Sequence, residues 1–221
     1  MKPDQWAAVD DYFESLFIPS DPILTAALES STAAGLPSIN VSPNQGQLLH
    51  VLARSHNVRR ILEIGTLGGY STIWLARALP ADGRLITLEL DPKHAVVAQQ
   101  NLDRAGVSSS VEIRVGRAIE TLEKLHAEQP APFDLVFIDA DKQSTKEYID
   151  WSLQLTRPGS LIIVDNVIRR GEVINAASDD ERVHGMRRAL DALAVEPRLL
   201  SAGVQTVGSK GYDGFVLAWV K

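Results

Sequence analysis

Hydrophobic residues follow two alternating patterns along most of the chain. From residue 59 onward, short runs of consecutive hydrophobic residues are separated by longer segments with the three- to four-residue spacing of an amphipathic helix. The runs predict strands at 59–65, 83–90, 110–116, 133–140, 159–166, 197–207 and 214–220, and the segments between them predict helices at about 70–79, 92–105, 117–128, 144–156 and 179–194. Strands of this kind, alternating with helices, predict an α/β fold with a mainly parallel sheet covered on both faces.

Both ends of the chain depart from this alternation. Before residue 58 only helical spacing occurs, and it predicts three helices, at 4–18, 21–34 and 43–55. Ser42 and Pro43 suit the N-cap and the first position of the third helix. No helix separates the last two strands, so we expect an antiparallel hairpin joined by a glycine-rich loop at 208–214. We expect one domain for the whole chain, with N-terminal helices over 1–57 and an α/β core over 58–221.

Composition and charge exclude several classes of protein. Charged residues make up 23% of the 221 residues, an ordinary share for a globular chain, and the formal net charge is −6. A surface that binds nucleic acid normally carries a basic excess, so nucleic acid is not an expected partner. The chain has no cysteine, which excludes disulfides and thiolate metal sites. Its N-terminal segment is acidic and no hydrophobic run reaches the roughly 20 residues of a membrane span, so we expect a cytoplasmic protein without membrane contact.

A glycine-rich turn follows the first predicted strand. It reads EIGTLGGYS, from Glu63 to Ser71, and ligands of open α/β sheets bind beyond such strand ends. Gly65 and Gly69 allow a tight turn and a close approach of the backbone to a ligand. The second strand ends with Glu89, where an acid commonly binds the ribose hydroxyls of an adenosine cofactor. An ordinary strand-to-helix turn is the alternative, but the two acids in these places favour a cofactor.

Two observations favour S-adenosylmethionine over a dinucleotide. The G-x-G-x-x-G fingerprint is absent, because Leu67 occupies the position of its second glycine. The carboxylates of Glu63 and Glu89 would face a pyrophosphate poorly, whereas S-adenosylmethionine carries an ammonium, a sulfonium and no phosphate. We therefore expect this methyl donor as the cofactor.

Oxygen-bearing side chains end two further strands. Asp139 ends the fourth predicted strand, and Asp165 and Asn166 end the fifth. If these strands are parallel neighbours, their backbones lie about 4.8 Å apart and the three side chains converge at one edge of the sheet. Each acid alone could instead cap a helix or loop. Together, two carboxylates and an amide form a ligand set for Mg²⁺, with Mn²⁺ and Ca²⁺ as alternatives.

Lys142 lies three residues after Asp139 in the same loop. A solvated surface lysine is the ordinary interpretation. Beside a divalent cation and a cationic cofactor, however, its ammonium form would be disfavoured, which makes Lys142 a candidate general base for a hydroxyl proton.

Three segments carry a family resemblance: ILEIGTLGGYS, FDLVFIDADK and GSLIIVDNV. They resemble the cation-dependent O-methyltransferases, the family of the caffeoyl-CoA and catechol O-methyltransferases and many small bacterial relatives. The resemblance extends from about Val41 to Val220. It implies a Rossmann-like, seven-stranded class I methyltransferase sheet with a C-terminal antiparallel hairpin, and a homodimer. It also implies transfer of a methyl group from S-adenosylmethionine to a vicinal aromatic diol held by a divalent cation.

The resemblance also implies roles for individual residues. The metal ligands would be Asp139, Asp165 and Asn166, and Lys142, together with Asp139, would serve catalysis. With the glycine turn included, the expected cofactor contacts are Val41, Glu63, Gly65, Thr66, Gly69, Ser71, Glu89, Ala118, Asp139 and Asp141. Arg170 departs from the family, because plant relatives have a substrate-contacting asparagine there. The loop at 208–214 is also longer than is usual, so the small-molecule acceptor is left open.

Three other functions share parts of this pattern. A nicotinamide-dependent oxidoreductase shares the sheet and the ribose acid, but should have the dinucleotide glycines. A nucleic-acid methyltransferase shares the cofactor, but would more often carry an Asn/Asp-Pro-Pro-aromatic motif where this chain has DADK. A non-catalytic cofactor-binding or regulatory module has no need of two acids, an amide and a lysine at one edge.

Overall fold

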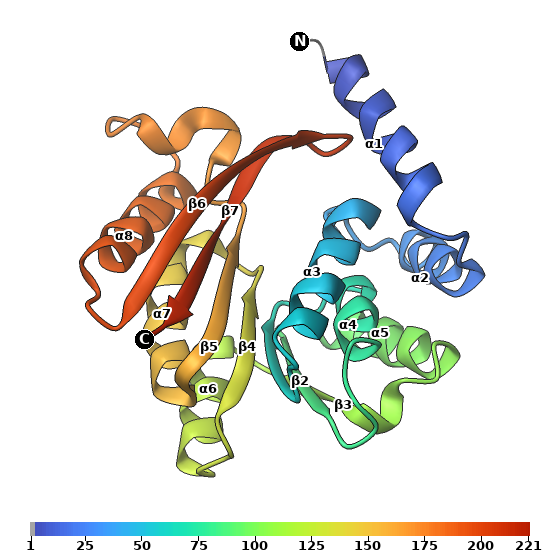
Figure 1. The fold of residues 1–221 in the computed structure, drawn as a ribbon, viewed down its shortest axis with the longest axis horizontal. Coiled ribbons are helices and arrows are strands. Elements are labelled where there is room, and N and C mark those ends of the chain that lie inside the picture. Colours follow the sequence, from blue (N-terminus) through green and yellow to red (C-terminus); the bar gives the residue numbers. More distant parts are fainter. Residues whose placement is uncertain (1–2) are drawn as a thin grey trace.

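The computed structural model describes residues 3–221, and its centre is one sheet of seven strands in the order β3-β2-β1-β4-β5-β7-β6 (Figure 1). The strands are β1 (Arg60–Ile64), β2 (Arg84–Glu89), β3 (Val111–Val115), β4 (Phe133–Ile138), β5 (Thr156–Asp165), β6 (Leu199–Gly208) and β7 (Gly211–Val220). The helices are α1 (Pro3–Phe17), α2 (Pro22–Ala33), α3 (Pro43–Ser55), α4 (Tyr70–Ala76), α5 (Pro92–Arg104), α6 (Ala118–Ala127), α7 (Thr145–Leu155) and α8 (Glu181–Val195). Three 3₁₀ segments are η1 (Ser108–Ser110), η2 (Lys142–Ser144) and η3 (Arg169–Ile174).

Strands β1 to β5 pair in parallel, and β7 pairs antiparallel with both β5 and β6. The predicted α/β sheet with a reversed C-terminal hairpin is therefore confirmed. The strand order reverses between β1 and β4, and ligands of such sheets bind beyond the strand ends at that point.

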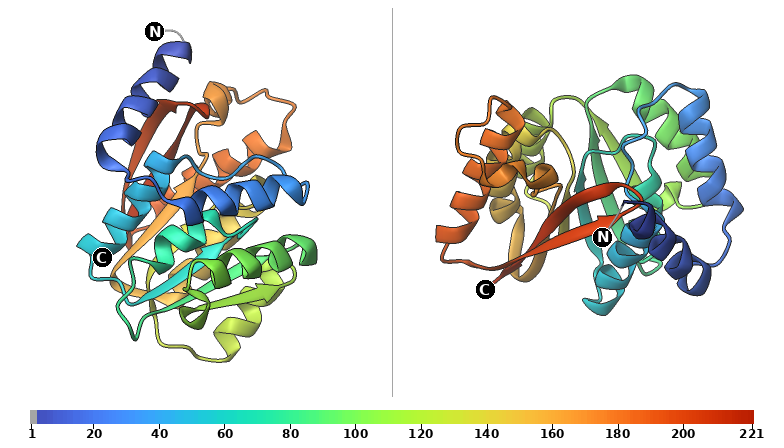
Figure 2. Two further views of the ribbon diagram at one scale, coloured as in Figure 1. Left: turned by 90° about the vertical axis from the view of Figure 1, so that its right-hand side faces the viewer. Right: turned by 90° about the horizontal axis from the view of Figure 1, so that it is seen from above.

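Helices cover both faces of the sheet (Figure 2), as the uniformly hydrophobic strands predict. Successive residues of β1 point to opposite faces, so Leu62 packs in the core with α6, α7 and α8, while Ile61 packs in the core with α3, α4 and α5. Both side chains have 0% exposure. Helices α2 to α8 each bury hydrophobic residues, whereas α1 buries none, and the covered sheet supports the loops at its carboxyl edge.

Two predicted boundaries are wrong in an informative way. The fifth strand is predicted to begin at residue 159, after the Arg157-Pro158-Gly159 turn, but β5 begins at Thr156 and includes these residues. The pairing of β5 with β4 shifts register between Phe133 and Leu135, and this irregularity accommodates the turn residues within the strand. The segment predicted as a loop at 208–214 is mostly strand: Gly208 pairs with Gly211, so only two residues form the turn. Close approach of β6 and β7 requires glycine at 214, where a Cβ would lie 2.2 Å from the Val204 carbonyl oxygen.

The first helix is tied to the tip of the β6–β7 hairpin. Asp10 of α1 accepts a 2.7 Å hydrogen bond from the Ser209 backbone N–H, and the Asn44 side chain donates to Asp10 from α3. Figure 1 shows the hairpin tip reaching toward α1 across the top of the molecule. No helix among residues 3–221 is long and apolar enough to cross a membrane.

Candidate active site

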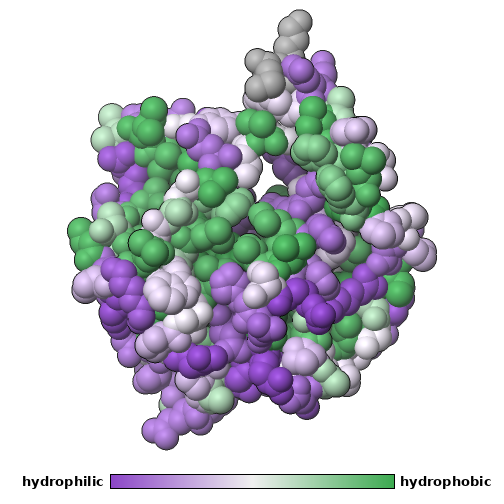
Figure 3. Space-filling model, in the orientation of Figure 1, coloured by the Kyte–Doolittle hydropathy of each residue, from purple (hydrophilic) through white to green (hydrophobic). Residues whose placement is uncertain are grey.

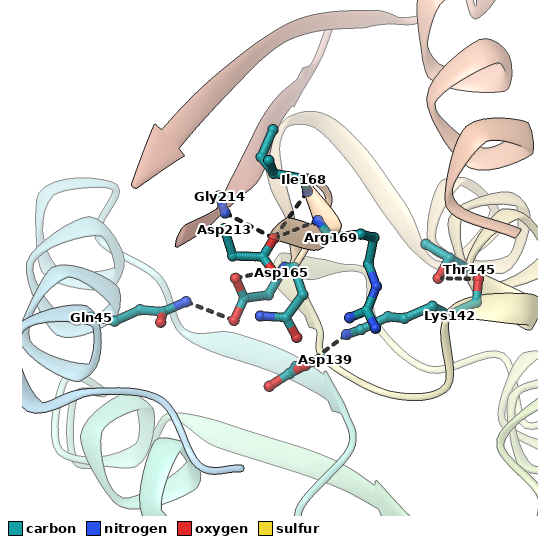
Figure 4. Close-up of polar contacts among 10 residues, drawn as sticks. Gln45, Asp139, Lys142, Thr145, Asp165, Ile168, Arg169, Asp213 and Gly214 are labelled. Carbon is teal, nitrogen blue, oxygen red and sulfur yellow. Dashed lines mark hydrogen bonds and ion pairs between the residues drawn. The ribbon is translucent and has the colours of Figure 1, made fainter. Parts of the chain in front are cut away.

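The ends of β4 and β5 bring the predicted acids together. Ile138 pairs with Val164 in the parallel register, so Asp139 and Asp165 follow at neighbouring strand ends. The condition set by the sequence, that these strands be parallel neighbours, is met. Figure 4 shows both carboxylates pointing into the same region, with Lys142 approaching from the following loop. The carboxyl edge of the sheet therefore concentrates negative charge at one place.

The carboxylate of Asp165 is buried, with 4% of the residue exposed. Its Oδ2 accepts a 2.7 Å hydrogen bond from Gln45 Nε2, and its Oδ1 accepts one of 2.8 Å from the Asn166 backbone N–H. Burial, and then the negative charge of Asp139, raise the pKa of Asp165. A divalent cation would relieve that repulsion, so these residues fit a metal.

The third candidate ligand is the amide of Asn166. Within residues 3–221 there is no group of three or more histidine, aspartate or glutamate side chains able to hold a metal. A metal at this edge would therefore depend on the Asn166 carbonyl oxygen in addition to the two acids. Asn166 has a φ of 58°, and the next residue is tied to β7 by a 3.0 Å hydrogen bond from the Val167 N–H to the Gly214 carbonyl. The backbone that carries the Asn166 side chain is therefore fixed in position.

Lys142 is not a solvated surface lysine, because only 8% of the residue is exposed. Its Nζ donates a 2.8 Å hydrogen bond to Asp139 Oδ1. The loop is held from behind by α8, where Gly185 has no side chain: a Cβ there would lie 2.4 Å from the Lys142 carbonyl oxygen. Lys142 is therefore fixed at the strand edge, with its ammonium beside Asp139.

Glu63, at the penultimate position of β1, is fully buried, with 0% exposure. Its carboxylate accepts hydrogen bonds from the hydroxyls of Ser71 (2.7 Å), Thr72 (2.5 Å) and Thr87 (2.7 Å). Burial raises its pKa to about 7 despite these donors, and the charge of Asp139 adds to the effect. Through Ser71 and Thr72, Glu63 thus fixes the first turn of α4 to the end of β1.

This pKa has a consequence for stability. Because the folded protein binds a proton at Glu63 more tightly than the unfolded chain, the contribution of Glu63 to stability falls as pH rises from about 4.5 to about 7. In metal-free protein without cofactor, the free energy of unfolding of wild type should fall relative to Glu63→Gln by up to about 3 kcal/mol between about pH 5 and about pH 8. Urea unfolding of both proteins measures it. Both proteins contain Asp165, so its titration cancels in the difference between their free energies of unfolding. If that difference does not change with pH, the expectation is contradicted.

The glycine turn between β1 and α4 is folded around Glu89. The Glu89 Oε2 accepts the backbone N–H groups of Thr66 (3.2 Å) and Leu67 (2.7 Å), and its Oε1 accepts that of Asp91 at 2.9 Å. Leu67 itself adopts a left-handed conformation with a φ of 51°. The turn is therefore formed without the second glycine of the dinucleotide fingerprint, and Glu89 stabilises it from the end of β2.

A cavity of about 970 Å³ opens at this edge of the sheet. The predicted site residues that line it are Val41, Gly65, Thr66, Ser71, Glu89, Ala118, Asp139, Asp141, Lys142 and Asn166. Glu63 and Gly69 do not line it: Glu63 lies behind Ser71, and Gly69 is the N-cap of α4, with a φ of 81°. Asp165 faces a smaller cavity of about 290 Å³, which shares Asn166 and Lys210 with the larger one. The two cavities meet at the candidate metal ligands.

Several site residues were not predicted. Gln45 binds Asp165 but lies on α3, and nothing in the sequence indicates how α3 docks on the sheet. Tyr148 of α7 donates a hydrogen bond from its hydroxyl to Asp141, which also accepts the Ser144 N–H at 3.2 Å. Arg169 lines the large cavity, and no periodicity marks it. The sequence places Gln45 in the first turn of the helix that Ser42 caps, and it gives no other indication of a role for this residue.

Comparisons with known proteins identify the family of the chain. Residues 18–218 match the family described as O-methyltransferase. The catechol O-methyltransferase of Niastella koreensis is 52% identical over 214 residues, covering 97% of each chain. The catechol O-methyltransferase of Mycobacterium tuberculosis is 52% identical over 213 residues, covering 96% of this chain and 95% of that protein.

Solved structures of O-methyltransferases are also similar to this chain. The O-methyltransferase of Bacillus cereus in complex with SAH superposes with a TM-score of 0.98 at 50% identity, over 100% of both chains. The O-methyltransferase TomG of Streptomyces achromogenes in complex with SAM has a TM-score of 0.97 at 48% identity, over 100% of this chain and 99% of that one. The chain therefore belongs to the O-methyltransferase family.

Proposed function

We propose that the protein transfers the methyl group of S-adenosylmethionine to one hydroxyl of a vicinal aromatic diol, with a divalent cation at Asp139, Asp165 and Asn166. The observation that carries this proposal is the convergence of these three residues with Lys142 where the two cavities meet, beside the glycine turn and Glu89, which line the larger one. The names of two relatives as catechol O-methyltransferases, and the SAM and SAH in two similar structures, support it.

The donor would occupy the part of the cavity between the glycine turn and Asp141. Glu89 would bind a ribose hydroxyl with the lone pair of Oε1 that its three backbone contacts leave free. Asp141 is held by Tyr148 and Ser144, so its carboxylate is already oriented for a cationic group of the donor. Glu63 would act through Ser71 by fixing that hydroxyl at the cavity wall.

At the acceptor end, Asp139, Asp165 and Asn166 would hold Mg²⁺, or Mn²⁺ or Ca²⁺ in its place. When bound, the metal supplies Lewis-acid activation that lowers the pKa of a hydroxyl on the acceptor. Gln45 holds Asp165 in position. Lys142, as the neutral amine, would accept the hydroxyl proton while the oxygen attacks the methyl group and S-adenosylhomocysteine leaves. Because the reaction joins a nucleophilic oxygen to a sulfonium methyl, fixed alignment of the two is the main contribution of these residues.

Methylation of a simple catechol tests this function directly. Purified protein with S-adenosylmethionine, Mg²⁺ and catechol should give the monomethyl ether, and EDTA should stop the reaction until excess Mg²⁺ is added. Phenol, which lacks the second oxygen, should be methylated at least about a hundredfold more slowly. If the donor binds but no vicinal diol is methylated in Mg²⁺, Mn²⁺ or Ca²⁺, the acceptor class is wrong. If S-adenosylmethionine does not bind, the whole proposal is wrong.

Replacing Lys142 separates proton transfer from cofactor binding. Lys142→Met keeps most of the aliphatic volume and removes the amine, so kcat for catechol should fall by about 10²- to 10⁴-fold, while the Kd for S-adenosylmethionine stays nearly unchanged. The exposed Lys146, which pairs with Asp150 at 2.6 Å, provides the matched control: Lys146→Met should leave kcat unchanged. An unchanged kcat across pH in the Lys142 variant would remove this residue from the proposed mechanism.

The homodimer implied by the family resemblance stays a prediction. Apolar side chains are exposed along α1, including Tyr12 (60%), Leu16 (55%) and Phe17 (63%), and on the hairpin, including Leu200 (64%). Figure 3 shows apolar surface on both elements. This is the surface that a second copy would cover.

A further inference from the structure

A rigid loop places Arg169 at the wall of the large cavity. Asp213 of β7 accepts backbone N–H groups from Ile168 (2.9 Å), Arg169 (3.1 Å) and Gly214 (3.0 Å), all on its Oδ1. Arg169 and Arg170 both adopt left-handed conformations, with φ of 54° and 57°. Non-glycine residues in this region are strained and are often found at functional sites. The hydrogen bonds from Asp213 stabilise this strained backbone, and the backbone in turn fixes the direction in which the Arg169 side chain extends.

The Arg169 guanidinium has no partner within residues 3–221. Its Nε is buried without a hydrogen bond, and the guanidinium forms no hydrogen bond or ion pair there. In Figure 4 the Arg169 side chain extends from the loop after β5 toward Lys142 and Asp139, and these two residues line the same cavity as Arg169. The residue as a whole is half-buried, so the cost falls on this one N–H. A buried N–H without an acceptor is uncommon in proteins, which points to an absent ligand.

The acids around this part of the cavity are already engaged. Asp139 accepts from Lys142, Asp141 accepts from Tyr148, and Asp180, which senses the charge of Arg169, is paired with Arg182. None of them forms a hydrogen bond or ion pair with Arg169.

A second cation, Lys210, stands at the cavity wall. Lys210 lies in the turn between β6 and β7, is exposed, and donates a 3.4 Å hydrogen bond to the Ser38 carbonyl oxygen. Partial burial of its side chain lowers its pKa. If two carboxylates balance a divalent metal and Lys142 is neutral as the general base, the positive charges of Arg169 and Lys210 remain at the acceptor end. This part of the cavity thus favours an acceptor with a negative charge beyond that of one ionised hydroxyl.

We propose that the acceptor is a catechol bearing a carboxylate and that the Arg169 guanidinium binds this carboxylate. The inference rests on the proposed methyl transfer and narrows its substrate class. A planar guanidinium can bind a carboxylate through two parallel hydrogen bonds, which neither a neutral ring substituent nor a lysine reproduces. Arg169 is thereby a specificity-determining residue, while the metal ligands and Lys142 act on the diol at the other end of the same acceptor.

The test compares 3,4-dihydroxybenzoate with 3,4-dihydroxybenzamide, which differ in charge and little in shape. Wild type should have a kcat/KM for the acid at least about tenfold above that for the amide, with the difference mainly in KM. Arg169→Gln should bring the ratio near unity by losing about ten- to a hundredfold on the acid, and should keep its rate on the amide. The rate on the amide also shows that the variant is folded, and equilibrium binding of both compounds to wild type provides the same comparison without any variant.

Arg170→Gln is the matched control, because Arg170 is the adjacent arginine, is also left-handed, and, unlike Arg169, is exposed and is not among the residues that line the large cavity. It should keep the wild-type ratio. The inference is overturned if wild type handles acid and amide alike, if Arg169→Gln slows both equally, or if that variant weakens S-adenosylmethionine binding instead, which would assign Arg169 to the donor. Methylation of neutral catechols alone would leave the proposed function standing and remove the acidic acceptor. Methylation of no catechol would remove the proposed function, and binding of the acid over the amide would then still report on Arg169.

Discussion

Asp165→Asn is expected to abolish turnover and, at the same time, to make the metal-free protein more stable. The substituted amide would lack the charge that holds a divalent cation, so kcat with Mg²⁺ should fall by at least about 10³-fold, equivalent to about 4 kcal/mol of transition-state stabilisation. In wild type this carboxylate is buried beside Asp139, and its pKa is raised. Ionised Asp165 therefore destabilises the folded state at pH above its unfolded pKa.

The stability part has a defined sign and magnitude. At about pH 8 in EDTA, Asp165→Asn should raise the free energy of unfolding by about 2 kcal/mol, because the amide keeps an oxygen for the hydrogen bonds of Gln45 or Asn166 and carries no charge. Added Mg²⁺ should stabilise wild type and leave the variant unchanged. Urea unfolding with and without Mg²⁺ measures both effects.

The control is Asp150→Asn, which removes an exposed carboxylate paired with Lys146 and changes the net charge equally. It should alter stability by less than about 0.5 kcal/mol and leave turnover intact. Retained activity of Asp165→Asn in EDTA would refute the metal site, whereas loss of activity with a lower stability would mean that Asp165 is structural. The two outcomes are distinguishable because activity and metal-free stability are measured on the same preparation.

The part of the site that follows from the sequence is the part located at strand ends. Uniformly hydrophobic runs show where β1, β2, β4 and β5 finish, and parallel pairing then brings their last residues to one edge. This places Glu89, Asp139 and Asp165 together without knowledge of any loop. The sequence needs only the condition that β4 and β5 are neighbours, and the structure meets it.

Contacts that depend on how distant segments dock could not be predicted in this way. Gln45 reaches Asp165 across 120 positions of sequence, and Arg169 is oriented by Asp213, 44 positions further along the chain. The predicted length of the hairpin turn is also wrong, since glycines at 208, 211 and 214 suggest a loop. In the structure they allow two strands to pair closely. Local composition does not distinguish these cases, because the deciding contacts are made by another element.

Gly65→Ala is expected to have the largest effect on folding of any single methyl group added near the site. Gly65 has a φ of +103°, and a Cβ there would lie 2.1 Å from the Asp139 carbonyl oxygen. The obstacle is the backbone directly after β4, which cannot rotate away as a side chain would. The cost of the left-handed conformation, about 1–2 kcal/mol, adds to about 1–3 kcal/mol for overpacking.

The free energy of unfolding should therefore fall by about 2–5 kcal/mol, as measured by urea unfolding. Any folded fraction should turn over slowly, because relief of the clash must move the backbone of Asp139. Gly106→Ala is the matched control: its φ is +68° and nothing lies within 4 Å of the added Cβ, so it should cost only about 1–2 kcal/mol and leave kcat unchanged. Equal destabilisation by the two substitutions would show that conformational strain alone governs position 65, and that the approach of the glycine turn to Asp139 tolerates a side chain.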